Sequence, residues 1–172
     1  MKKIIILIAL SLAVFGILSA QTIKIAYIDS EKIMAESKDT KEAQKLFQKD
    51  REGWTKQVND LDAEITRLEN DYSTKKLTLS AAGKKQAEEK IEQKKTERKE
   101  MVESIFGEKG RAATRNAELL QPIMTKLRTI IEKICVDEGY SMIFDASSSG
   151  IIWAQPKLDI SERVILEMNK TE

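Results

Sequence analysis

Residues 47–72 have the sequence FQKDREGWTKQVNDLDAEITRLENDY, and the spacing of the apolar residues in this stretch decides the fold. Two sets of apolar residues each recur every seven positions, three or four residues apart from one another: Phe47, Trp54, Leu61 and Leu68 in one set, and Val58, Ile65 and Tyr72 in the other. They occupy alternating a and d positions of a heptad that only Arg51 interrupts. This narrow stripe predicts a long helix with one or two helical neighbours and with its remaining faces in water.

A returning helix is expected after a reversal near Lys75. The segment 74–80 is rich in helix-ending residues, and Ser80 is the best N-cap for the helix that follows. Gly107, Gly110 and Pro122 lie inside the returning pattern, so we expect a weakened helix with a kink near Pro122. The apolar positions of the return are Ala87, Ile91, Met101, Ile105, Leu120, Ile123, Met124, Leu127, Ile130, Ile131 and Ile134, with Lys94 and Arg98 at two seam positions.

The two helical segments are too long for a compact domain. Segments of roughly 40 and 50 residues, at a rise of about 1.5 Å per residue, extend about 60 to 75 Å. The hairpin must therefore project from the rest of the chain. We predict a predominantly helical α+β fold with a small β-rich body and a projecting antiparallel helical hairpin.

The body is expected to form from the two ends of the chain. In residues 23–29, Ile23, Ile25 and Tyr27 alternate with smaller or polar residues, which predicts a strand with one buried face, and Asp29 or Ser30 can cap a short helix after it. Residues 140–145 and 151–154 are predicted to be two strands of a hairpin, followed by a last helix capped by Asp159 or Ser161. So few strands leave an unpaired sheet edge, which predicts a homo-oligomer.

The amino terminus has the pattern of a cleaved secretory signal peptide. Lys2 and Lys3 precede an uncharged apolar run from Ile4 to Leu18, and Ala20 offers a small residue before the cleavage point. The alternative is a membrane anchor, but this run is shorter than the ~20 residues that span a bilayer. We expect residues 1–20 to be the signal peptide, residues 21–38 and 115–172 the body, and residues 39–114 the hairpin.

The composition excludes several kinds of chemistry. The 172 residues include no histidine, which is the commonest general base and metal ligand, and one cysteine, Cys135, which rules out an intrachain disulfide. Phosphate-binding glycine loops, nucleophile motifs and metal-ligand spacings are missing from the sequence. The chain has 29 Lys and Arg against 28 Asp and Glu, so nucleic-acid binding is not expected. We predict neither enzymatic activity nor a cofactor.

One local charge feature stands apart from this neutral total. Between residues 74 and 86 the only charged side chains are Lys75, Lys76, Lys84 and Lys85. These lysines can simply keep the end of the hairpin solvated. The other interpretation is a contact for anionic lipid, lipopolysaccharide or acidic client segments.

The order of these segments resembles the Skp (OmpH-like) family of periplasmic chaperones. The resemblance covers the chain after the signal peptide and rests on spacing more than on any single motif. It is carried by residues 25–33 (IAYIDSEKI), Leu120-Gln121-Pro122-Ile123, Gly139-Tyr140 with Ile143-Phe144-Asp145, and Leu158-Asp159-Ile160-Ser161.

The resemblance implies a periplasmic homotrimer whose three hairpins enclose a cavity. In that cavity, family members hold unfolded outer-membrane β-barrel precursors without ATP. For the sheet and part of the trimer contact we expect Ile25, Tyr27, Ile143, Phe144, Ile152 and Trp153. Ile91, Met101, Ile105 and Phe106 are candidate client contacts, with packing inside the hairpin as the alternative.

A structural coiled-coil spacer or adaptor that binds one defined partner is the competing function. The interruptions at Lys94 and Arg98 favour the holdase, because a permanent spacer would be more stable with an uninterrupted heptad. Near-zero net charge argues against strong electrostatic capture of clients by the whole surface, so that such binding would be confined to the lysine-rich tip.

Overall fold

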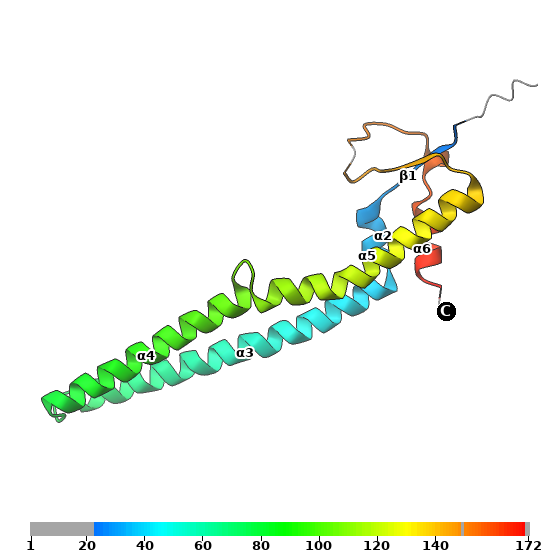
Figure 1. Ribbon diagram of the computed structural model, residues 1–172. Coiled ribbons are helices and arrows are strands. Elements are labelled where there is room, and N and C mark those ends of the chain that lie inside the picture. Colours follow the sequence, from blue (N-terminus) through cyan, green and yellow to red (C-terminus); the bar gives the residue numbers. More distant parts are fainter. Residues whose placement is uncertain (1–22, 149, 171–172) are drawn as a thin grey trace, which may run out of the picture.

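The computed structural model describes residues 23–148 and 150–170, so that the predicted signal peptide lies outside the described residues. It confirms the predicted fold class: a long helical hairpin projects from a small body that contains a two-stranded sheet (Figure 1). In chain order the elements are β1 (Ile25–Ile28), α2 (Ser30–Glu36), α3 (Lys38–Lys75), α4 (Ala81–Phe106), α5 (Arg111–Glu138), β2 (Met142–Asp145), η2 (Pro156–Leu158) and α6 (Ser161–Met168).

Side-chain caps begin the first three of these helices. The Asp29 carboxylate accepts a hydrogen bond from the backbone N–H of Lys32 at 2.9 Å and begins α2. The buried Ser37 hydroxyl accepts from the Thr40 N–H at 3.4 Å and begins α3. Ser80, the predicted cap of the returning helix, accepts from the N–H of residue 83 at 3.2 Å. Each cap satisfies a backbone donor that the first turn of a helix leaves free.

The returning limb of the hairpin is two helices rather than one. It is interrupted between α4 and α5, at residues 107–110, whereas α5 continues through Pro122. A Cβ atom on Gly107 would lie 2.4 Å from the Glu103 carbonyl oxygen, and one on Gly110 would lie 2.6 Å from the Ile105 carbonyl oxygen. The interruption therefore requires glycine at both ends. The glycines, not the proline, divide the return.

The sheet differs from the predicted hairpin of residues 140–145 with residues 151–154. β2 pairs in parallel with β1, with Ile25 opposite Met142 and Ile28 opposite Asp145. Residues 151–154 form no strand, and the Ile152 side chain is fully exposed. The hairpin prediction was wrong because β2 takes its partner from the other end of the chain, a pairing that local alternation of residues cannot reveal.

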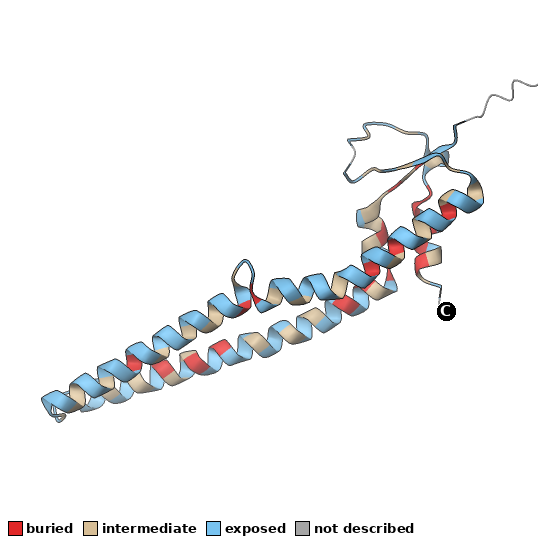
Figure 2. Ribbon diagram, viewed as in Figure 1, coloured by how far each residue is buried: buried red, intermediate tan, exposed pale blue. Residues whose placement is uncertain are grey.

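The core of the body lies where one face of the sheet meets α2, α5 and α6. Ile33, Val164 and Met168 are the most deeply buried of its side chains. Figure 2 shows that buried residues concentrate in the body and recur only at intervals along the hairpin. The full cluster is Ala26, Ile28, Ile33, Ala43, Ile123, Leu127, Ile134, Ile160, Val164, Ile165 and Met168.

Two serine-centred networks tie α6 and β2 to the start of the chain. The buried Ser161 hydroxyl accepts a hydrogen bond from the Asp29 backbone N–H at 2.8 Å, and the Asp159 carboxylate accepts from the Ser161 backbone N–H at 2.8 Å. The N-cap residue of α6 is Ile160. The predicted caps, Asp159 and Ser161, are the residues immediately before and after it. The second network surrounds Asp145 and is described below.

Candidate functional site

One face of the sheet is left without cover by the part of the chain that the structure describes. The register places Ile25 opposite Met142 and Tyr27 opposite Phe144, all on this face, while Ala26 and Ile28 point into the core. The Ile25, Met142 and Phe144 side chains are 40%, 52% and 38% exposed. Parallel sheets are normally covered on both faces, so this apolar face is suited to contact with another protein surface.

The remaining residues predicted for the body divide between two environments. Ile143 lies on the covered side of the sheet and packs against the core. Ile152 and Trp153 lie between β2 and η2; Ile152 is fully exposed and Trp153 is 77% exposed. Met142 was not among the predicted contact residues. Its place beside Ile25 follows only from the parallel register.

The sheet also has an unpaired edge within the described chain. β1 pairs with β2 along one side and forms a single bridge, Tyr27 to Asp159, on its other side. β2 pairs with β1 alone. Two strands are too few for an independently stable sheet in water, and a free edge invites a further strand. The packing of this sheet on the helices of the body therefore supports it, and its free edge within the described residues can accept a further strand.

The hairpin interior is a narrow apolar seam, as the heptad predicted. Val58, Leu61 and Ile65 of α3 are buried, as are Ile91 and Ile105 of α4. The two α4 isoleucines, candidate client contacts from sequence, thus lie inside the hairpin. Of the other two candidates, Met101 is half-buried and Phe106 is 41% exposed.

Ion pairs cross the hairpin along its length, and sequence reasoning missed them. The two seam interruptions are matched from α3: Lys94 contacts Glu64 at 3.1 Å, and two guanidinium nitrogens of Arg98 contact the Asp62 carboxylate at 3.0 and 3.2 Å. From the sequence, Lys94 and Arg98 are expected only to interrupt the seam. The sequence does show opposite charges beside the heptad seam, which is a signal for ion pairs between the two limbs. Which charges pair depends on how the two limbs are aligned along each other. The other cross-hairpin pairs are Lys95–Glu69 at 2.8 Å, Arg115–Asp50 at 2.8 Å and Lys126–Asp39 at 2.8 Å.

These contacts favour the charged forms of the basic groups. Hydrogen bonds to Glu97 and Glu64 raise the pKa of Lys94, and a hydrogen bond to Glu69 raises the pKa of Lys95. Exposed pairs of this kind contribute little to stability one by one. Arranged as a series, they specify which residues of α3 and the return face each other.

The tip of the hairpin combines lysines with one fully exposed leucine. Leu77, in the turn between α3 and α4, is 96% exposed, and Lys75 and Lys76 beside it are exposed too. Lys84 is half-buried, and Lys85 pairs with Glu89 at 3.8 Å. The structure thus brings the four predicted lysines to the end of the hairpin.

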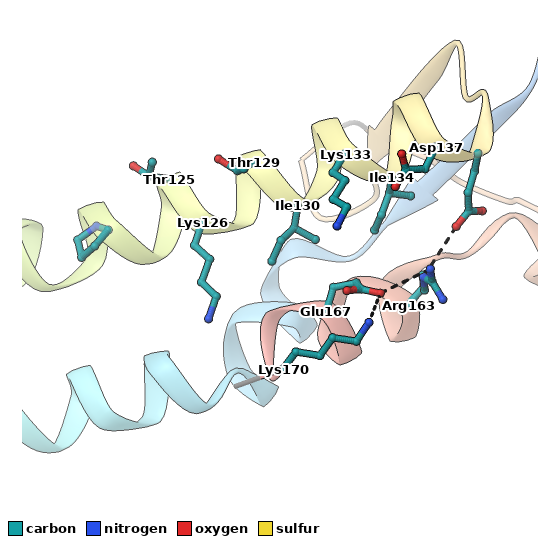
Figure 3. A pocket seen from close by; sticks show the side chains of 12 residues that line it. Thr125, Lys126, Thr129, Ile130, Lys133, Ile134, Asp137, Arg163, Glu167 and Lys170 are labelled. Atoms are coloured by element: carbon teal, nitrogen blue, oxygen red, sulfur yellow. Dashed lines mark hydrogen bonds and ion pairs between the residues drawn. The ribbon is translucent and has the colours of Figure 1, made fainter. Parts of the chain in front are cut away.

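A cleft of about 860 Å³ lies between α5 and α6 (Figure 3). Ile130 and Ile134 contribute apolar surface to it. Its rim is a chain of ion pairs in which Glu167 contacts Lys170 at 2.7 Å and Arg163 at 3.5 Å. The hydrogen bond from Lys170 lowers the pKa of Glu167. Lys170 and Arg163, the cationic groups at this end of the rim, thus form ion pairs with a carboxylate.

Asp145, at the end of β2, accepts hydrogen bonds from the start of α2 and from the turn that follows β2. Its carboxylate accepts hydrogen bonds from the Ser30 hydroxyl at 2.6 Å and the Ser30 N–H at 3.1 Å, and from the Ser147 hydroxyl at 2.8 Å. Burial raises the pKa of Asp145, but the hydrogen bonds from Ser30 and Ser147 outweigh it and lower the pKa from 3.8 to about 2. The ionised carboxylate fastens the sheet to α2.

Replacing Asp145 with asparagine should destabilise the body by about 1–2 kcal/mol at neutral pH. Because the folded pKa is depressed, the stabilisation is present above roughly pH 4 and is lost as the pH falls toward 2. Urea unfolding at pH 7 and pH 2.5 measures both effects. The difference between the wild type and Asp145→Asn should shrink at the lower pH, whereas the exposed Asp71→Asn control should match the wild type at both. An equal difference at the two pH values would contradict this role.

Among residues 23–148 and 150–170, no three His, Cys, Asp or Glu side chains are grouped as a metal site would require. No helix within these ranges combines the length and apolar character needed to cross a membrane.

The family model described as outer membrane protein (OmpH-like) matches residues 24–168, and the chain belongs to this family. A solved structure of a protein from Caulobacter crescentus, described as an OmpH-like outer membrane chaperone, superposes with a TM-score of 0.76 at 14% sequence identity. The match covers 91% of this chain and 93% of that one, so the two share a fold. No curated protein has significant similarity to the sequence.

Proposed function

We propose that this chain is an ATP-independent periplasmic holdase chaperone that encloses unfolded outer-membrane β-barrel precursors and prevents their aggregation. Membership of the OmpH-like family supports a role as an outer-membrane protein chaperone. The observation that carries the holdase mechanism is the projecting hairpin, which presents a long, mostly solvated surface and buries few of its own apolar residues. Such a surface can shield a chain through many weak contacts and still release it.

The working unit in this proposal is a homotrimer joined through the body. The uncovered face of Ile25, Tyr27, Met142 and Phe144 and the free edge of β2 support self-association. The exposed Ile152 and Trp153 would complete the contact. In this proposal the described residues within 21–38 and 115–172 belong to the body and residues 39–114 to the arm, so that three arms would surround a shared space.

Client chains would touch the arms between the ion pairs. Exposed apolar side chains occur singly there, with Phe106 at 41% and Leu46 at 44% exposure. Isolated apolar contacts among solvated charges give weak, replaceable binding, as a holdase needs. In this scheme Ile91 and Ile105 hold the arm together and do not contact the client.

The coiled-coil spacer remains a second candidate because of the ion pairs. The seam positions Lys94 and Arg98 are matched by Glu64 and Asp62, so the hairpin is continuous where the sequence suggested interruptions. The interruptions at Lys94 and Arg98 therefore no longer favour the holdase over the spacer. A rigid arm serves either function.

An aggregation assay separates the two candidates. A β-barrel precursor unfolded in urea is diluted into buffer with the mature protein, and light scattering and soluble precursor are measured without ATP. The holdase proposal expects the precursor to stay soluble at about one trimer per client. If the folded protein leaves aggregation unchanged at several-fold excess, the holdase function is excluded and the spacer is favoured.

A related proposal concerns anionic surfaces at the tip. Replacing Lys75, Lys76, Lys84 and Lys85 with Gln should weaken binding to anionic vesicles by about tenfold or more at low salt, since each basic residue near such a surface contributes about 1 kcal/mol. Vesicle co-sedimentation measures the binding, and sedimentation velocity checks that the oligomer is intact. A control with the same charge change on the arm replaces Lys41, Lys45, Lys49 and Lys99. Equal loss in both variants would contradict a site at the tip.

A further inference from the structure

The side of α3 that faces away from α5 is basic where the arm leaves the body. Ala43 is buried in the core of the body, and Phe47 occupies a seam position of the same helix. Lys41, Lys45 and Lys49 each lie two residues from one of these positions, which places them about 160° around the helix, on its opposite side. All three lysines are exposed, and we call them the basic row.

The basic row has no ion-pair partner among the residues that the structure describes. Of the carboxylates in the same part of α3, Asp39 and Asp50 each pair with a basic residue of α5 at 2.8 Å. Glu42 lines a groove between α3 and α5, and Glu52 accepts a hydrogen bond from the Gln48 side chain at 3.1 Å. The three lysine charges are therefore uncompensated within the described chain.

Helix stability does not explain the basic row. Like charges four residues apart destabilise a helix, whereas opposite charges at the same spacing stabilise it. The arm has the favourable arrangement elsewhere, with Lys56 contacting Asp60 at 2.6 Å and Lys85 contacting Glu89 at 3.8 Å. In the basic row the same spacing brings together charges of one sign. The row is therefore suited to an anionic partner that the described residues do not supply.

The spacing of the row matches an extended chain. Residues four apart in a helix are separated by about 6 Å along its axis, so the three lysines span about 12 Å. Alternate residues of an extended strand point to the same side at intervals of about 6.7 Å, so three of them span about 13 Å. Acidic residues at every second position would each meet one lysine, because the flexible lysine side chains absorb the small difference.

Two glutamines favour an extended partner over a helical one. The basic row lines a shallow groove of about 500 Å³ together with Gln44 and Gln48. Side-chain amides donate and accept hydrogen bonds, and an extended segment still has free backbone N–H and C=O groups to offer them. A helix has already used these groups within itself. The groove thus complements an extended acidic segment.

We propose that the basic row binds extended client segments that carry acidic residues at every second position. This inference rests on the proposed holdase function, whose clients are β-barrel precursors. Strands of such barrels alternate apolar and polar residues, so an unfolded strand segment presents its polar residues to one side. Three exposed ion pairs hold the segment weakly at the root of the arm, and salt screens them, which suits release.

Peptide binding to the mature protein tests the row. Two fluorescent peptides with blocked ends have the same composition, Thr-Glu-Thr-Glu-Thr-Glu-Thr and Thr-Thr-Glu-Glu-Glu-Thr-Thr. Fluorescence anisotropy at low salt should show clearly tighter binding of the first peptide. The row variant, in which Lys41, Lys45 and Lys49 are replaced with Gln, should bind that peptide about tenfold more weakly, because three modest ion pairs are lost together.

The matched control removes the same charge from the tip. In this tip variant Lys75, Lys76 and Lys85 are replaced with Gln, and its affinity for the first peptide should stay close to that of the wild type. Circular dichroism checks that both variants keep their helices.

Crosslinking gives a second reading of where the peptide binds. In a Cys135→Ser background, a photo-crosslinker attached at Gln44→Cys should capture the first peptide. The same crosslinker at Ala63→Cys lies on the same side of α3, about five turns further out, and should capture little.

The proposal is overturned if the tip variant loses as much affinity as the row variant, if the two peptides bind equally well, or if both crosslinkers capture the peptide equally. Loss of anionic vesicle binding by the row variant, with its peptide binding unchanged, would assign the row to lipid and also overturn it. None of these readings uses a client or an aggregation assay. A row that fails them leaves the holdase function standing, and a failed holdase assay leaves the peptide result unaffected.

Discussion

Replacement of Phe144 by aspartate should convert the proposed trimer into monomers. Phe144 lies on the uncovered face of the sheet beside Tyr27, and its side chain is 38% exposed in one chain. In the proposed trimer, the variant would bury one unpaired carboxylate per subunit in an apolar contact. The expected cost of several kcal/mol per charge weakens association by at least about a hundredfold.

Light scattering coupled to size-exclusion chromatography measures this effect as mass against concentration. Leu77→Asp introduces the same charge at the far end of the arm, where the leucine is 96% exposed, and should leave the mass unchanged. Circular dichroism should show that the Phe144→Asp protein keeps its helices. If both variants have the wild-type mass, the uncovered face is not the association surface.

Truncation of Ile105 to alanine should destabilise the arm by about 2–4 kcal/mol. Ile105 is completely buried at the end of α4, and deletion of its side-chain atoms leaves a cavity that the surrounding helices fill only in part. Because few other apolar side chains are buried in the arm, the loss is large relative to its local stability.

Hydrogen exchange with thermal unfolding locates the damage. Exchange should accelerate in α4 and in the facing part of α3, while the core around Ile33 and Met168 keeps its protection. Phe106→Ala, at the neighbouring half-exposed position, is the matched control and should cost less than about 1 kcal/mol. Equal acceleration in the two variants would show that Ile105 does not anchor the arm.

Local sequence signals were sufficient for the arm. The period of Phe47 to Tyr72 predicted α3, and Ser80 marked where α4 begins, since a cap and a heptad act within a few residues. The ion pairs Glu64–Lys94 and Asp62–Arg98 could not be assigned in the same way. A shift of one turn between the limbs would have given each charge another neighbour.

The sheet shows the corresponding limit in the body. Residues 142–145 were correctly expected to form a strand, but the residues that follow Ser147 and its turn suggested a partner at 151–154 that does not exist as a strand. The true partner, β1, lies more than a hundred residues earlier. Pairing at that distance is decided by how α5 returns the chain to the body.

The sequence by itself determined the existence of a long, narrow helical arm, its caps and its lysine-rich tip, because these depend on periods and contacts within one or two turns. Only the tertiary structure decided which charges meet across the arm, which face of the sheet the described residues leave uncovered and where the returning limb is interrupted. Each of these depends on the register between segments far apart in the chain. Register follows from the folded arrangement of the whole chain, and no local pattern specifies it.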